Sequence, residues 1–209
     1  MMNAVQSLEE KKVELCHLGA LAYGKGMVAG SGGNISFREG NGIYITPSGY
    51  PLDAVRPQDL IFVDMNGAYE GSVRPSIETA LHLVCYAARP DVQAIFHLHS
   101  YYSILAGLRA QVGCENAMPA YTGSYACKVG VATVAPLYPS GAKALNDAVA
   151  ASLSRCSAVL LKNHGVVCCG ASLRKAFSLC EDVEMNARLH DALQGAGALT
   201  GEQIKSLRP

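Results

Sequence analysis

The stretch Ala94-Ile95-Phe96-His97-Leu98-His99 (AIFHLH, residues 94–99) carries the strongest structural signal in this chain. A short apolar run of this length is typical of a buried β-strand. Side chains alternate between the two faces of a strand, so His97 and His99 should point to one side and Leu98 to the other. Two neutral imidazoles on one face can chelate a divalent metal, zinc above all. The pair alone is a weak motif, because one histidine could simply end the strand.

A third histidine follows in Lys162-Asn163-His164-Gly165, between the β-like runs 158–161 and 166–169. A turn here would hold His164 at a strand end, on the side of the first pair if the strands are neighbours. Three histidines would leave a coordination position open, as a catalytic zinc requires. Taken alone, His164 would be an ordinary turn residue.

The segment Arg74-Pro75-Ser76-Ile77-Glu78 marks the start of a helix predicted over 77–88. Free N–H groups at a helix start favour anions, so Ser76 either caps the helix or also contacts a phosphate. Glu78 either complements the helix dipole or, beside a metal, acts as a ligand and moves a proton. His82, one turn later, is expected to give structural support.

Two loops are rich in glycine: Gly30-Ser31-Gly32-Gly33-Asn34 and Thr46-Pro47-Ser48-Gly49. Such loops can turn consecutive N–H groups toward an anion, and Asn34 and Ser48 could add side-chain donors. Neither loop matches a Walker A or dinucleotide-binding motif. The two loops are therefore either ordinary turns or parts of a phosphate site.

Around these motifs the sequence predicts alternating helices and strands, which favours an α/β or α+β layered fold. Tight turns expected at Asn41-Gly42 and Asn66-Gly67 favour antiparallel pairing of the early strands. Helices are predicted over 7–25, 77–88, 102–108, 142–153, from 173 and from 200; strands over 35–37, 43–46, 60–63, 94–98, 131–135, 158–161 and 166–169.

The composition excludes several classes of protein. With 17 basic and 17 acidic residues in 209, the chain lacks the basic excess of nucleic-acid-binding proteins. No run of about 18 apolar residues predicts a membrane span, and Met1–Lys12 has no signal-peptide character. The eight cysteines form no CxxC pair, so we expect buried thiols, with Cys168 and Cys169 on alternate faces of a strand. A cytoplasmic location is predicted.

Five motifs in unbroken order, over about residues 7–190, resemble the class II aldolase/adducin family. They are GSGGNIS (30–36), TPSG (46–49), RPSIE (74–78), HLHS (97–100) and KNHG (162–165). The order of five motifs is far more specific than any one of them. The resemblance implies one three-layer α/β/α domain over residues 1–209, with a largely antiparallel central sheet. It also implies a homotetramer with active sites near subunit interfaces.

The resemblance also implies the roles of the site residues. It makes His97, His99 and His164 the ligands of a zinc ion, or of another divalent transition metal. Glu78 becomes the catalytic acid/base and a fourth ligand in the resting state. The positions implied for phosphate binding are Gly33, Asn34, Ser48, Gly49 and Ser76.

The implied activity is that of a zinc-dependent lyase. It would cleave a phosphorylated ketose, such as fuculose 1-phosphate, by a retro-aldol reaction. Zinc would stabilise an enediolate, which Glu78 would protonate to give dihydroxyacetone phosphate beside the released aldehyde. Alternatives using the same chemistry are a 3-oxo-tetronate 4-phosphate decarboxylase, a sugar-phosphate epimerase and a dehydratase. A non-catalytic adducin-like module is disfavoured because all four metal-site residues are present, and no HExxH motif suggests a protease.

The chain departs from the fuculose aldolases at three places. Ile77 stands where they carry a second serine before the glutamate, so one phosphate hydroxyl is missing. Their middle-loop tyrosine has no clear match, although Tyr121 and Tyr125 are available. The tail ending at Pro209 contains no tyrosine. These departures leave the aldehyde specificity open and make the decarboxylase the second hypothesis.

Overall fold

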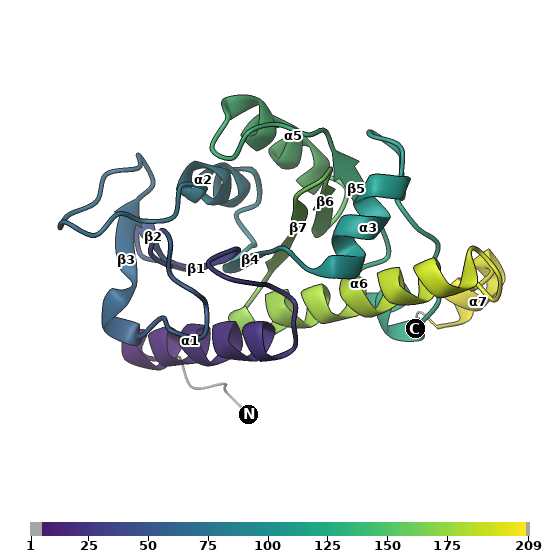
Figure 1. Ribbon diagram of the computed structural model, residues 1–209, viewed down its shortest axis with the longest axis horizontal. Coiled ribbons are helices and arrows are strands. Elements are labelled where there is room, and N and C mark those ends of the chain that lie inside the picture. Colours follow the sequence, from purple (N-terminus) through teal and green to yellow (C-terminus); the bar gives the residue numbers. More distant parts are fainter. Residues whose placement is uncertain (1–5, 208–209) are drawn as a thin grey trace.

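The computed structural model describes residues 6–207 and contains one seven-stranded mixed sheet (Figure 1). Residues 1–5, which belong to the polar stretch Met1–Lys12, and residues 208–209 lie outside this description. The strands are β1 Asn34–Glu39, β2 Gly42–Ile45, β3 Ile61–Asp64, β4 Ala94–Leu98, β5 Ala132–Ala135, β6 Ala158–Leu161 and β7 Gly165–Gly170. Their order is β3-β2-β1-β4-β7-β6-β5, and only β5 and β6 run parallel. The predicted, largely antiparallel sheet is confirmed.

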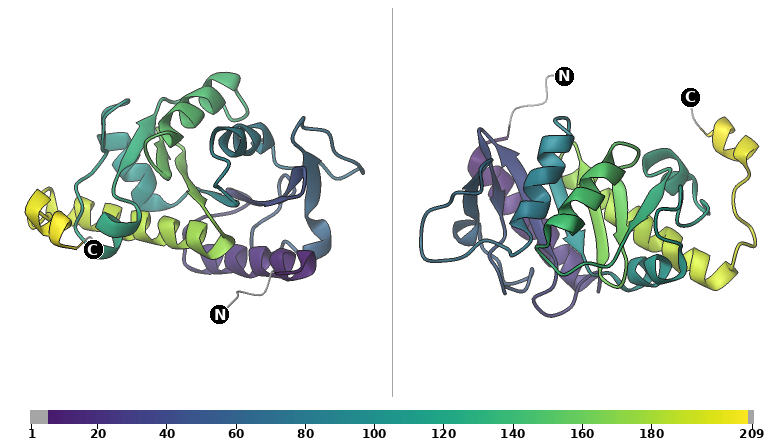
Figure 2. Two further views of the ribbon diagram at one scale, coloured as in Figure 1. Left: turned by 180° about the vertical axis from the view of Figure 1, so that it is seen from behind. Right: turned by 90° about the horizontal axis from the view of Figure 1, so that it is seen from above.

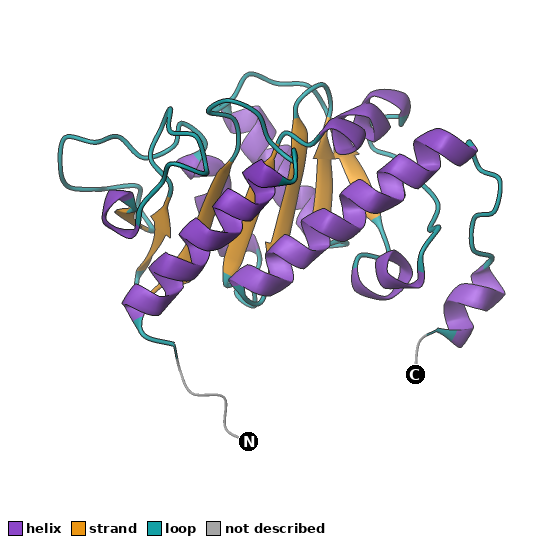
Figure 3. Ribbon diagram, turned by 60° about the horizontal axis from the view of Figure 1, so that its bottom comes forward, coloured by secondary structure: helices purple, strands orange, loops and turns teal. Residues whose placement is uncertain are grey.

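Helices cover both faces of the sheet (Figures 2 and 3). They are α1 Leu8–Gly24, α2 Thr79–Ala88, α3 Tyr101–Arg109, α4 Gly123–Lys128, α5 Lys143–Leu153, α6 Leu173–Leu193 and α7 Gly201–Ser206, with a 3-10 turn η1 at Pro57–Asp59. One apolar cluster joins the sheet to α1, α3, α4 and α6, and a second joins it to α2 and α5. The predicted α/β/α layering is confirmed. Within residues 6–207, no helix has the length and apolar character needed to cross a membrane.

The alternation of side chains along β4 and β7 divides the core. Phe96 packs into the cluster with α1 and α6, whereas Ile95 packs into the cluster with α2 and α5. On the neighbouring strand, Cys168 and Cys169 divide in the same way, as predicted, and all eight cysteines are free thiols. Because residues i and i+2 of a strand share a face, His97 lies on the α2 and α5 side with Ile95.

Three local predictions were wrong. Helix α2 begins at Thr79 rather than residue 77, because Thr79 N–H bonds to the Ser76 carbonyl in a turn and Glu78 is the N-cap. A helix, α4, lies in a segment predicted as loop, and the Thr122 hydroxyl caps it by accepting from Tyr125 N–H. The β1–β2 hairpin turns at residues 40–41 rather than 41–42.

Candidate metal centre

His97 is held in place by its own strand and by the next one. It lies on β4, is fully buried, and its Nδ1 is 3.1 Å from the backbone carbonyl of Val166 on β7. A carbonyl oxygen only accepts hydrogen bonds, so Nδ1 carries a proton. In the neutral ring Nε2 then presents its lone pair to the centre. A hydrogen bond of this kind orients most metal-binding histidines.

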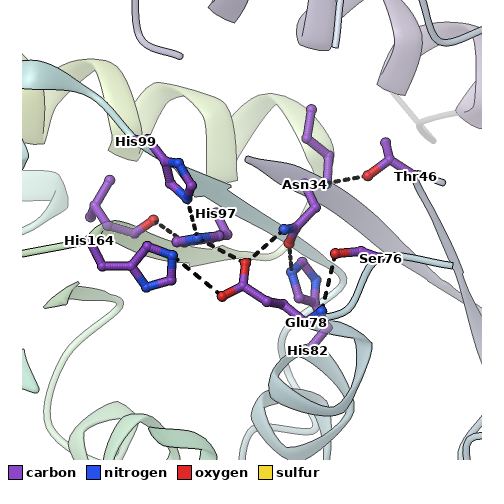
Figure 4. Close-up of polar contacts among 10 residues, drawn as sticks. Asn34, Thr46, Ser76, Glu78, His82, His97, His99 and His164 are labelled. Atoms are coloured by element: carbon purple, nitrogen blue, oxygen red, sulfur yellow. Dashed lines mark hydrogen bonds and ion pairs between the residues drawn. The ribbon is translucent and has the colours of Figure 1, made fainter. Parts of the chain in front are cut away.

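The other two histidines approach His97 from chain turns. His99 lies just beyond β4, with its Nε2 2.9 Å from Nε2 of His97. His164 lies in the β6–β7 turn, where Asn163 adopts a left-handed conformation (φ 58°) that asparagine tolerates better than most residues. The three ring centroids are each 4.8 Å from the other two. The three imidazoles therefore face one point (Figure 4).

Glu78 completes the cluster from the start of α2. Its Oε2 lies 3.1 Å from His97 Nε2 and its Oε1 lies 3.5 Å from His164 Nε2. One ligand atom from each of Glu78, His97, His99 and His164 lies within 4.8 Å of all the others. Tetrahedral zinc with bonds of about 2.0–2.1 Å separates its ligand atoms by about 3.3 Å, which these spacings match.

One carboxylate oxygen is buried without a hydrogen bond. Glu78 is 3% exposed, and its Oε1 has no hydrogen-bond partner among residues 6–207. Burying a carboxylate oxygen costs free energy unless the oxygen is hydrogen-bonded, ion-paired or bound to a metal. The donor set of three imidazoles and a carboxylate is one that zinc binds. The residues present therefore fit a divalent transition metal.

The protonation states suit metal binding. Burial opposes ionisation of Glu78, but the contacts with His97 and Asn34 outweigh it and hold the pKa of Glu78 well below its ordinary value. Burial, reinforced by the neighbouring histidines, lowers the pKa of His99 to about 4 and also lowers that of His164. An ionised carboxylate and neutral imidazoles are the forms that bind a metal.

We expect the metal-free protein to lose stability as the pH falls from about 6.5 to about 4. The pKa of His99 is about 4 in the folded chain against an ordinary value of 6.5, so the unfolded chain binds more protons between these values. The free energy of unfolding should be highest above pH 6.5. Urea titrations in the presence of chelator measure it. His99→Asn should flatten the pH slope, whereas replacing exposed His17 by Asn should not; equal slopes would contradict the assignment.

Glycines let the chain pass close to the histidines. A Cβ on Gly32 would lie 2.7 Å from Nδ1 of His99, and one on Gly33 would lie 2.9 Å from the carbonyl oxygen of His97. Gly33 also has a positive φ of 74°. A Cβ on Gly165 would overlap the carbonyl oxygen of Leu98. These three glycines thus have a steric role at the site, whatever ligand the loops bind.

Gly165→Ala is expected to lower the free energy of unfolding by about 1–3 kcal/mol, the usual cost of overpacking. The backbone of Leu98 cannot yield without disturbing the pairing of β4 and β7. Urea unfolding measures the change. Gly24→Ala is the matched control, because no atom of residues 6–207 lies within 4 Å of a Cβ there, apart from the chain neighbours and the backbone of its own helix. Equal stability of the two variants would show that the close approach does not matter.

Four of the predicted phosphate-binding residues lie on loops, and the fifth, Asn34, is the first residue of β1 and contacts Glu78. Ser48 N–H bonds to the Arg74 carbonyl, and Ser76 N–H bonds to the Thr46 carbonyl, so the TPSG and RPSIE segments pair. The Ser76 hydroxyl accepts from Glu78 N–H at 3.2 Å. Gly49 is exposed and has a φ of 79°. The fold thus gathers these positions on one side of the cluster.

Asn34 lies against Glu78 rather than in an open loop. Its Nδ2 donates to Glu78 Oε2 at 2.9 Å, and its Oδ1 lies 2.6 Å from Nε2 of His82. One N–H of the amide is left for another partner. The sequence predicted a supporting role for His82 but not this contact of Asn34, nor Ser36 and Tyr86 behind it. The signal that could have shown them is spacing, since Glu78, His82 and Tyr86 are four residues apart along one helix face.

Neither tyrosine of the middle loop presents its hydroxyl to the cluster. The Tyr121 hydroxyl accepts from Gly195 N–H and lies 3.1 Å from Nδ1 of His190. Tyr125 is fully buried in the core, and burial raises the pKa of its phenol above the usual value. Both side chains therefore pack within the chain.

The match to known proteins agrees with this geometry. A family model described as the class II aldolase and adducin N-terminal domain matches residues 13–190. The chain belongs to this family. Members of the class II aldolase and adducin family with solved structures share the whole fold: YgbL from Klebsiella pneumoniae is 31% identical, with a TM-score of 0.91 over 98% of this chain and 100% of that one.

Two characterised relatives differ in how much of their length they share with this chain. A 3-oxo-tetronate 4-phosphate decarboxylase from Haemophilus influenzae is 33% identical over 200 residues, covering 94% of this chain and 95% of the relative. An L-fuculose phosphate aldolase from Escherichia coli (strain K12) is 32% identical over 166 residues, covering 79% and 75%. Two family members with different activities, a decarboxylase and an aldolase, are thus about equally identical to this chain in sequence.

Proposed function

We propose that this protein is a carbon–carbon lyase that uses a divalent metal, zinc first, to act on a phosphorylated sugar or sugar acid. The observation that carries the proposal is the buried Oε1 of Glu78, which faces His164 and has no hydrogen-bond partner in the described part of the chain. A carboxylate beside three metal-binding imidazoles can both hold the ion and move a proton.

Glu78 is the acid/base of the proposed reaction. A bound divalent ion supplies Lewis acidity that polarises the substrate carbonyl and stabilises the negative charge formed when the carbon–carbon bond breaks. Asn34 holds Oε2, so Oε1 is the oxygen that can deliver a proton to the substrate carbon. His97, His99 and His164 would hold the ion, and three protein ligands would leave a position for substrate.

Two substrates give the same product through the same proton step. Retro-aldol cleavage of a ketose 1-phosphate breaks the C3–C4 bond and releases an aldehyde. Decarboxylation of 3-oxo-tetronate 4-phosphate breaks the bond to the carboxylate and releases carbon dioxide. In each case the bonding pair stays on the carbon next to the carbonyl, and one proton on that carbon yields dihydroxyacetone phosphate.

Decarboxylation is the first reaction to test. The decarboxylase relative is matched over almost its entire length, whereas the fuculose aldolase is matched over three quarters of its own. Ile77 replaces the hydroxyl that fuculose aldolases place before the glutamate, and its side chain is 67% exposed. Aldol cleavage remains the second candidate, supported by the aldolase relatives.

We propose that Gly33, Asn34, Ser48, Gly49 and Ser76 hold the phosphate. Support comes from the pairing of the TPSG and RPSIE segments and from the contact of Asn34 with Glu78. The positive φ angles of Gly33 and Gly49 also turn backbone N–H groups out of regular structure. Backbone donors suit a site without a clustered basic excess.

A coupled assay for dihydroxyacetone phosphate tests both reactions with one readout. The zinc-loaded protein is given 3-oxo-tetronate 4-phosphate or a panel of ketose 1-phosphates, with and without chelator. Chelator-sensitive product together with carbon dioxide would establish the decarboxylase, and product together with an aldehyde would establish the aldolase. No product from any phosphorylated substrate would overturn the proposal.

We further propose a cytoplasmic homotetramer with the active site near an interface. Apolar side chains flank the centre: Ile77 precedes Glu78, Tyr101 follows the HLHS motif, and each is 67% exposed. Exposed apolar side chains beside a site are typical of a surface that another subunit covers. Light scattering measures the mass. A monomer at working concentrations, active with both side chains exposed, would overturn the proposal.

A further inference from the structure

A continuous chain of hydrogen bonds leads from Glu78 into the core between β1 and α2. Figure 4 shows its first part, from Glu78 through Asn34 to His82. Asn34 Nδ2 lies 2.9 Å from Glu78 Oε2, and Asn34 Oδ1 lies 2.6 Å from His82 Nε2. Ser36 Oγ lies 2.6 Å from His82 Nδ1 and 2.8 Å from the Tyr86 hydroxyl. Every one of these side chains is buried. Ordered buried chains of this kind rigidify the groups they join.

The chain has one self-consistent direction of donation. An ionised carboxylate only accepts, so Asn34 must turn its Nδ2 toward Glu78. Its Oδ1 then faces His82, which requires a proton on Nε2. A buried imidazole without an acidic partner is neutral, so Nδ1 accepts from the Ser36 hydroxyl. Ser36 in turn accepts from Tyr86, whose pKa burial raises well above its usual value.

The far end of the chain is anchored. The Arg38 guanidinium lies 4.9 Å from the Tyr86 ring centroid and donates to the Tyr86 backbone carbonyl at 2.8 Å. It also donates to the Val92 carbonyl at 3.2 Å. Tyr86 is therefore tied to β1 through Arg38 and Ser36, and Arg38 is itself held by the Val92 carbonyl just before β4. The orientation of the Asn34 amide is thus fixed by buried side chains of β1 and α2.

We propose that His82 is a positioning residue for Glu78. Through its Nε2–H it fixes the orientation of the Asn34 amide, which holds Oε2 and leaves Oε1 as the oxygen for proton transfer. If the amide turned over, its carbonyl would face the carboxylate, and Oε2 of Glu78 would lose the hydrogen bond that Asn34 donates. The inference rests on the proposed function, because it gives Glu78 its geometry for that reaction.

Two variants of similar size separate this role from packing. In His82→Gln the side-chain amide can reach the place of Nε2 and donate to Asn34, whereas in His82→Asn the shorter amide reaches only the place of Nδ1. With the zinc-loaded protein we expect the kcat of His82→Asn to fall about 10–100-fold, the usual loss when a residue that orients a metal ligand through hydrogen bonds is replaced. Zinc content should stay near wild type, and any rise in KM, which the proposed contact of Asn34 with the phosphate allows, should be smaller than the loss of kcat. His82→Gln should recover most of the loss.

The controls make the outcomes decisive. Thr133→Val removes a buried hydroxyl on β5, at the sheet edge away from the centre, and should lower thermal stability without changing kcat. An equal loss of kcat in both His82 variants, a loss that follows the melting temperature, or a change in KM alone would overturn the proposal.

A second measurement does not depend on activity. Nitrogen-15 NMR of histidine-labelled, zinc-loaded protein should show a neutral His82 ring protonated at Nε2, identified by its absence from the His82→Gln spectrum. A proton on Nδ1 would overturn the inference even in an active enzyme. The expected tautomer in a protein inactive on every phosphorylated substrate would instead count against the proposed function alone.

Discussion

Glu78→Gln should lower kcat by about 10²–10⁴-fold, the range for removal of a general acid/base, while the protein keeps its metal. Glutamine has the shape of glutamate but does not move a proton at neutral pH. His97, His99 and His164 remain to hold the ion. Turnover is measured by the coupled assay and zinc by elemental analysis of the same samples.

The proton step can be isolated from bond cleavage in this variant. Wild-type protein should exchange a hydroxymethyl proton of dihydroxyacetone phosphate with deuterated water, and Glu78→Gln should not. Asp182→Asn is the control, because this largely buried carboxylate on α6 pairs with Lys128 away from the centre. A variant with full zinc and near-normal turnover or exchange would remove Glu78 from the proposed role.

Removal of the metal should lower the melting temperature by about 8–16 °C. A ligand present at about 1,000 times its dissociation constant stabilises the folded state by about 4 kcal/mol, and each kcal/mol corresponds to about 2–4 °C in a chain of this size. The four candidate ligand groups converge only in the folded chain, so an ion held by them would bind the folded state. Differential scanning fluorimetry with and without chelator measures the shift.

His99→Ala should abolish most of this shift and bring the zinc content well below one ion per chain. His99 lies at the end of β4 and is less buried than His97, so its loss disturbs packing less. His17→Ala is the matched control, since His17 is exposed on α1. A chelator shift of the same size in both variants would show that the ion binds elsewhere.

The sequence predicted much of the fold because the relevant signals are local. Side chains alternate along any strand, so the strand predicted at 94–98 puts His97 and His99 on one face, and this result depends only on the geometry of one strand. The tight hairpins of the first half predicted antiparallel pairing. The capping box of Ser7 and Glu10 marked the start of α1, and both of its hydrogen bonds are present.

Local signals failed where tertiary contacts decide. Helix α2 begins two residues later than predicted. The Ser76 N–H bonds to the Thr46 carbonyl, and the turn from Ser76 to Thr79 leaves Glu78 as the N-cap. Helix α4 was missed because it is short and begins with glycine. Tyr121 and Tyr125 could not be separated from catalytic tyrosines until their packing was known.

The sequence by itself determined the residue types, the order of five motifs, the family and the shared face of His97 and His99. Only the tertiary structure brought His164 and Glu78 to that pair, lowered the pKa of His99 and joined Asn34 to His82. The physical reason is range. Strand and helix periodicity act over a few residues, whereas the spacing of ligands and the burial of charges depend on strand order and on contacts between distant segments.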